Sequence, residues 1–120
     1  MTVEQQLRDE DARLEDEERK ETEKEHLGTQ ARLILDHPLV IEAFSALEDG
    51  AFNAWKNSTV ADRETREKLF LQYQAMQQFR RFFEETMDSG KIAKAYLPDI
   101  RKQRRSIRER LKGFMTGRAA

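Results

Sequence analysis

Residues that commonly carry catalysis or bind metals are few in this chain. The sequence has no cysteine and only two histidines, His26 and His37, so a zinc site would depend on carboxylates. Glu23 and His26 form a Glu-x-x-His pair like those of di-iron bundles, but the segment around them is too polar to be a core. Phosphate-binding loops, nucleophile elbows and zincin motifs are also missing from the sequence. We therefore predict no catalytic residue, no metal site, no cofactor and no enzymatic activity.

A basic segment near the C-terminus is the strongest functional signal. Lys and Arg spaced along a helix attract a phosphate backbone through charge alone. The candidate residues for binding a partner or nucleic acid are Arg101, Lys102, Arg104, Arg105, Ile107, Arg108, Arg110, Leu111 and Lys112. The apolar residues Ile100, Ile107, Leu111 and Phe114 form a line that suits docking on a protein or on an anionic membrane. A solvated helix packed on its own chain would give the same pattern. We favour docking on a protein, because a tail that only bound phosphates would not need these apolar residues.

The charges are distributed unevenly along the chain, although the net charge is only −1. Residues 1–28 contain eleven acids and five bases, whereas residues 91–120 contain two acids and ten bases. Such an asymmetry indicates a polyanionic partner for the basic end, or head-to-tail contacts between copies of the chain.

One long helix must position most of the aromatic residues. Residues 62–89 contain no Gly or Pro and consist mostly of strong helix formers. Its residues at helical spacing form a stripe that should face the core: Leu69, Tyr73, Met76, Phe79, Phe83 and Met87. Phe70, Leu71 and Phe82 fall outside this stripe, so either neighbouring segments of the chain or another subunit must cover them. We interpret these three residues as candidate self-association residues.

A second helix should lie beside the long one. Pro38 suits the first turn of a helix over residues 38–56, with Asp36 or His37 as its cap. The short connection at residues 57–59 predicts antiparallel neighbours, with Phe44 and Phe83 in one core. Asp62 should cap the start of the long helix, or serve as the acidic member of a Thr59-x-x-Asp62 capping box.

Glycine and proline should mark the remaining boundaries. Gly28 should precede a short helix over residues 30–35, Gly90 should end the long helix, and Pro98 should start a last helix over residues 99–112. Residues 1–26 have too few large apolar side chains to offset the entropy of ordering them. We expect this segment to be disordered, or a solvated helix that becomes fixed only on a partner. We find no sustained heptad pattern.

These observations predict an all-α protein of one domain. Its parts are an acidic segment over residues 1–28, flexible or a solvated helix; an antiparallel helical hairpin core with a short preceding helix over residues 29–97; and a basic amphipathic C-terminal helix and tail over residues 98–120. The longest apolar runs are three residues, so we expect no membrane-spanning segment and no signal peptide.

Four stretches carry a resemblance to a known group of proteins. Residues 33–44 read Leu-Ile-Leu-Asp-His-Pro-Leu-Val-Ile-Glu-Ala-Phe, and residues 54–57 read Ala-Trp-Lys-Asn. Residues 62–70 read Asp-Arg-Glu-Thr-Arg-Glu-Lys-Leu-Phe, and residues 86–93 read Thr-Met-Asp-Ser-Gly-Lys-Ile-Ala. This pattern resembles small, mostly uncharacterised, all-helical phage and prophage proteins, which implies a role among head-assembly and packaging genes. The charge layout is also similar to that of phage scaffolding proteins, whose basic C-terminal helices contact coat protein. A small terminase subunit is similar through its oligomerising helical hairpin, but its usual DNA-binding module is not evident here.

The resemblance and the residue patterns lead to one hypothesis with one alternative. The hypothesis is a non-enzymatic, self-associating component of phage virion assembly or DNA packaging, with a coat or portal protein as partner. It would act in the host cytoplasm during assembly or in the virion itself. The alternative is a nucleic-acid-binding accessory protein that acts through the basic C-terminal helix.

Overall fold

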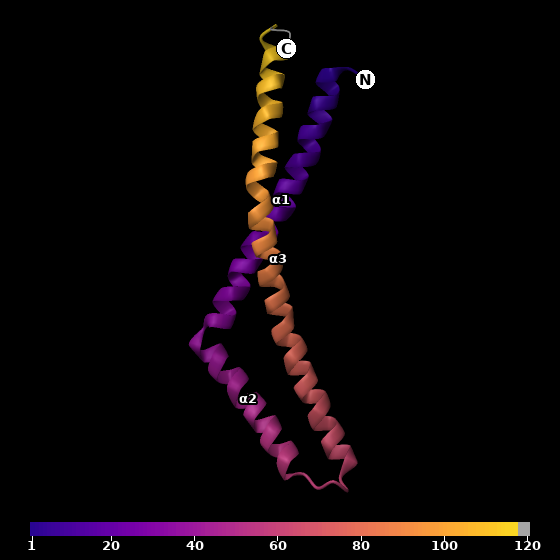
Figure 1. Cartoon of the computed structure of the whole chain (residues 1–120), viewed down its shortest axis with the longest axis vertical. Helices are drawn as coiled ribbons and strands as arrows, with labels where there is room; N and C mark the ends of the chain where they lie inside the picture. The colour runs from indigo at the N-terminus through magenta and orange to yellow at the C-terminus, as the bar shows by residue number, and fades with distance from the viewer. Residues whose placement is uncertain (118–120) are drawn as a thin grey trace. The chain divides into compact units, whose positions relative to one another are not determined.

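The computed structural model describes residues 1–117, and these form three α-helices (Figure 1). The helices are α1 (Val3–Asp36), α2 (Pro38–Asn57) and α3 (Arg63–Met115). The described residues contain no strand, so the predicted all-α class is confirmed. The chain divides into two compact units, which we call the terminal unit (Met1–Leu27 with Asp88–Ala120) and the central unit (Gly28–Met87).

The ends of α2 and the start of α3 follow local sequence signals. His37 has an extended backbone, and its Nδ1 accepts a hydrogen bond from the Leu39 amide at 3.1 Å, with Pro38 at the first helical position. At the start of α3, Asp62 Oδ1 accepts a hydrogen bond from the Thr65 amide at 3.2 Å. Hydrogen bonding by Thr65 lowers the pKa of Asp62 below its ordinary value. Both predicted caps are therefore confirmed.

Three other predicted boundaries are wrong. Gly28 lies inside α1, while Gly90 and Pro98 lie inside α3. The expected short helix over residues 30–35 is thus the end of a 34-residue helix, and the expected last helix continues a 53-residue helix. A glycine costs a helix about 1 kcal/mol and an interior proline about 3 kcal/mol. Leu97 and Ile100, which lie just before and just after Pro98, are buried, and their burial can offset such a cost.

The terminal unit pairs the first part of α1 with the last part of α3. Its core consists of Leu7 and Leu14 from α1 and Ile100 and Ile107 from α3, with Leu111 and Phe114 packed against it. The acidic segment is therefore helical, as one of its two expected alternatives had it, but its Leu7 and Leu14 pack on α3 of the same chain. The predicted division also differs from the observed one, because residues 1–27 and 88–120 belong to a single unit.

Both helices of the terminal unit follow a seven-residue period. In α3 the covered positions include Gly90, Ala93, Leu97, Ile100, Arg104, Ile107, Leu111 and Phe114; in α1 they include Glu4, Leu7, Asp11, Leu14, Glu18, Glu21 and Glu25. Alternating steps of three and four residues are typical of coiled coils. The sequence-based conclusion that no heptad pattern exists is wrong, and it failed because most inward positions of α1 are acidic.

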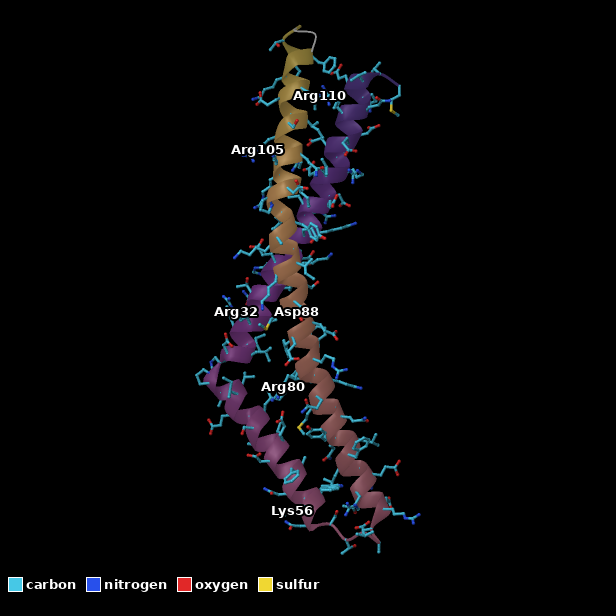
Figure 2. The ribbon with its side chains drawn as sticks, in the orientation of Figure 1. Arg32, Lys56, Arg80, Asp88, Arg105 and Arg110 are labelled. Atoms are coloured by element: carbon cyan, nitrogen blue, oxygen red, sulfur yellow. The ribbon has the colours of Figure 1, made fainter. Side chains whose placement is uncertain are left out.

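The central unit pairs α2 with residues 63–87 of α3. The rings of Phe44 and Phe79 are 6.0 Å apart, and Arg80 forms a 2.6 Å ion pair with Glu48. Figure 2 marks Arg80 on this part of α3. Nearer the connection, the Arg66 guanidinium lies 4.6 Å from the centre of the Trp55 ring. The order of these contacts runs in opposite directions along the two helices.

The core of the central unit is small. Phe44 is buried and Phe83 is half-buried. By contrast, 44% of Tyr73 and 58% of Phe79 are exposed, so the predicted core-facing stripe of α3 is only partly covered within the chain.

Candidate interaction site

Arg104, one of the predicted binding residues, is held by α1. Its Nε lies 3.1 Å from Asp11 Oδ1, its Nη1 lies 2.9 Å from Glu18 Oε2, and its Nη2 lies 3.8 Å from Glu15 Oε2. Only 11% of the Arg104 side chain is exposed. Hydrogen bonds to Asp11 and Glu18 raise the pKa of Arg104, and the bond from Arg104 is the largest cause of the lowered pKa of Glu18. Arg104 is therefore a structural ion-pair residue, which is a correction to its expected role in binding.

Ile107 and Leu111, the apolar residues that we expected to dock on a partner, pack within the chain instead. Ile107 is buried in the core of the terminal unit, and Leu111 packs against that core. Two of the basic candidates have ionic partners as well: Arg101 lies 3.4 Å from Glu18, and Lys112 lies 3.2 Å from Glu109. The packing of Ile107 and Leu111 on α1 leaves neither of them available to dock on another protein in this structure.

The acidic and basic ends of the chain compensate each other in the terminal unit. Residues 1–27 have eleven acids and five bases, a net charge of −6, while residues 88–120 have three acids and ten bases, a net charge of +7. Together they carry a net charge of +1. The asymmetry that indicated an external polyanion is thus largely matched inside the chain.

A basic stripe nevertheless remains exposed on α3. Lys102, Arg105, Arg108 and Arg110 are exposed and form no ion pair within residues 1–117. Arg105 and Arg110 are labelled in Figure 2 on the C-terminal part of α3. The same holds for Lys91 and Lys94, which are not among the predicted binding residues. By helical spacing, the unpaired Lys91, Lys94, Arg105 and Arg108 form one line with Arg101 and Lys112, which have ionic partners. We call these six residues the basic stripe; Lys102 and Arg110 lie outside it. The heptad-like spacing is the signal that could have revealed Lys91 and Lys94.

The three predicted self-association residues are all uncovered. The exposed fractions are 55% for Phe70, 54% for Leu71 and 64% for Phe82. Cover by neighbouring segments of the chain was one of the two alternatives for these residues, and no segment within residues 1–117 provides it. They do not share one face, however, because Phe70 and Leu71 are adjacent in a helix and point about 100° apart.

Phe70 and Leu71 belong to two different apolar faces of the central unit. The aromatic face is a hollow that includes Phe52, Trp55, Phe70 and Tyr73. The groove face contains two hollows that share Leu47, Ala75 and Met76. Leu71 and Phe82 line neither hollow, but helical spacing puts them on the same side of α3 as Ala75, so we include them in the groove face. Its members are Ala43, Ala46, Leu47, Gly50, Ala54, Leu71, Ala75, Met76, Phe79 and Phe82.

Neither a metal site nor a membrane span emerges from the described part of the chain. Among residues 1–117, no cluster of three or more His, Cys, Asp or Glu side chains is arranged to hold a metal ion. Within the same residues, no helix has the length and apolar character needed to cross a membrane. Both histidines are exposed, and His37 acts as the cap of α2.

Comparisons of the chain with protein-family models, with curated proteins and with solved structures give no match.

Proposed function

We propose that this protein is a non-enzymatic, self-associating component of phage virion assembly or DNA packaging. The observation that carries the proposal is the uncovered apolar surface of the central unit. Thirteen large apolar side chains of residues 28–87 are exposed, whereas Phe44 is the one large apolar side chain there that is buried. Monomeric proteins rarely leave such patches in water, and larger patches mark interaction sites.

In this proposal, α2 and the first half of α3 act as an antiparallel helical hairpin whose core is completed by association. The terminal unit has its own core and its own ion pairs, so its folding does not require the central unit to bury more surface. The phage context rests on the resemblance of residues 33–93. A coat or portal protein is the partner that this resemblance implies.

Mass in solution tests the self-association. The monomer has a mass of 14.2 kDa, and light scattering or sedimentation equilibrium at micromolar concentrations should give at least twice this value. A mass of one chain throughout that range would refute the proposal. Co-expression with the coat and portal proteins of the same genome then tests the phage role, and capture of neither protein would refute that part.

The basic stripe supports a second candidate function, which is binding of nucleic acid. Its unpaired members Lys91, Lys94, Arg105 and Arg108 can contact successive phosphates. The logarithm of the affinity should then fall with the logarithm of the salt concentration, by about 0.9 for each duplex phosphate contacted. Replacing Arg105 and Arg108 by Gln should flatten this slope. An unchanged slope, or no binding of DNA by the wild type, would exclude this candidate.

A further inference from the structure

We propose that the groove face of the central unit pairs with the same face of a second copy of this chain, so that two copies form a four-helix bundle. This inference rests on the proposed self-association and specifies which surface performs it. The bundle would consist of α2 and residues 63–87 of α3 from each copy.

The groove is built to accept a helix. Its floor is lined by small residues from both helices, with Ala43, Gly50 and Ala54 on α2 and Ala75 on α3. Small side chains allow the backbone of another helix to approach closely. The larger residues Leu71 and Phe82 lie along the same side of α3 as Ala75, at helical spacing.

Gly50 has no explanation within the chain. It lies in the interior of α2, where glycine weakens a helix relative to alanine. A Cβ atom added at Gly50 would meet no other atom within 4 Å, so packing within this chain does not require a glycine there. The close approach of a helix from outside would require one.

The chemistry of the groove favours a second copy as its occupant. None of the residues that line its two hollows is charged, although 38% of the chain is charged. The occupant must therefore be an apolar helical surface with little charge, and the groove face itself is such a surface. It presents large residues beside small ones, so a two-fold axis can place the Phe79 and Phe82 of one copy over the alanines of the other.

The exposed area is also sufficient for a stable dimer. Leu47, Leu71, Phe79 and Phe82 are each more than half exposed. A fully buried aromatic side chain covers about 150–250 Å². Because little more than half of each side chain is still exposed, these four offer on the order of 350–550 Å² per copy. The exposed alanines between them, Ala43, Ala46, Ala54 and Ala75, add to this and bring the face toward the ~800 Å² per partner of a standard interface.

Two adjacent residues provide a matched test. Leu71 belongs to the groove face and Phe70 to the aromatic face, and their exposed fractions are nearly equal, 54% and 55%. Sedimentation equilibrium should show that Leu71→Glu raises the dimer dissociation constant at least tenfold, while Phe70→Glu changes it less than threefold. Circular dichroism of each variant confirms that the helices are retained.

The outcomes separate this inference from the proposed function. Suppose that the wild type associates. If Phe70→Glu weakens this association more than Leu71→Glu does, or if both variants or neither weaken it, the groove face is not the interface, although self-association itself stands. A different protein as the occupant would appear as a monomeric wild type that pairs only with that protein. A monomeric wild type would overturn the inference and the proposed function together.

A cross-linking experiment answers the same question without destabilising the helix. The chain has no cysteine, so an introduced cysteine is the only thiol. Oxidation should yield cross-linked dimers with Ala43→Cys or Ala54→Cys, which lie in the groove. Ser45→Cys is the control, because residue 45 points about 160° away from residue 43 around the helix. Equal cross-linking at Ser45→Cys and at the groove positions would overturn the inference.

Discussion

Replacing Arg104 by Met tests whether the acidic head and the basic tail hold the terminal unit together. The change keeps an apolar side chain of similar length but removes the guanidinium that contacts Asp11, Glu15 and Glu18. The contacts at 3.1 and 2.9 Å are short enough to be charge-assisted hydrogen bonds, whereas the third, at 3.8 Å, is a weaker ionic contact. A hydrogen bond to a charged group contributes about 1.5–3 kcal/mol, and the two main carboxylates remain 20% and 24% exposed. We therefore discount the sum and expect a loss of about 2–3 kcal/mol.

Thermal unfolding followed by circular dichroism at neutral pH measures this loss. A destabilisation of about 2–3 kcal/mol should lower the Tm by on the order of 8–12 °C in a chain of this size. Trp55, the only tryptophan, lies in the central unit, so its fluorescence reports on that unit and should change less. Arg105→Met is the matched control, because Arg105 is exposed and has no ionic partner within residues 1–117. A loss below about 0.5 kcal/mol for Arg104→Met, or an equal loss for both variants, would refute the structural role of the ion pairs.

Three further predictions follow from the packing of the two units. The stability difference between wild type and Arg104→Met should be complete above about pH 5 and should shrink as the pH falls below about 4. The reason is that the lowered pKa of Glu18 stabilises the folded state only while its carboxylate is charged. Urea titrations at each pH measure this difference, and a value that stays constant from pH 7 to pH 3 would contradict the prediction. Deletion of residues 1–26 should lower the Tm by on the order of 10 °C, because Ile100 and Ile107 lose their covering leucines; calorimetry showing an unchanged Tm would restore the view that this segment is dispensable. Phe44→Ala should cost about 3 kcal/mol, and Phe83→Ala should cost clearly less because its ring is only half-buried; chemical denaturation that gives the reverse order would mean that the core of the central unit is assigned incorrectly.

Local signals in the sequence were enough to predict the helical class and several helix ends. The caps at His37 and Asp62 could be predicted because a cap depends only on residues within one turn of it. Helical spacing placed Phe70, Leu71 and Phe82 outside the core-facing stripe, but it left open whether the chain itself covers them, and only the structure shows them exposed.

The tertiary structure decided what the glycines, the proline and the charged ends do. Gly28, Gly90 and Pro98 were predicted to interrupt helices, because isolated helices are weakened at such residues. They lie inside α1 and α3, where packing of neighbouring residues outweighs a local cost of a few kcal/mol. Helix propensity alone contains no information about that packing.

The role of the basic segment depended on a partner far away in the sequence. Arg104 and Asp11 are 93 residues apart, and no local pattern connects them. The inward positions of α1 are mainly acidic. The heptad of α1 therefore becomes recognisable only when α1 lies beside Arg104, Ile100 and Ile107 of α3. Composition and periodicity determined that this chain is helical, charged and carries large apolar residues outside its main apolar stripe. Only the pairing of distant segments decided which arginine is bound internally, which lysines and arginines stay exposed, and which apolar face remains open to a second copy.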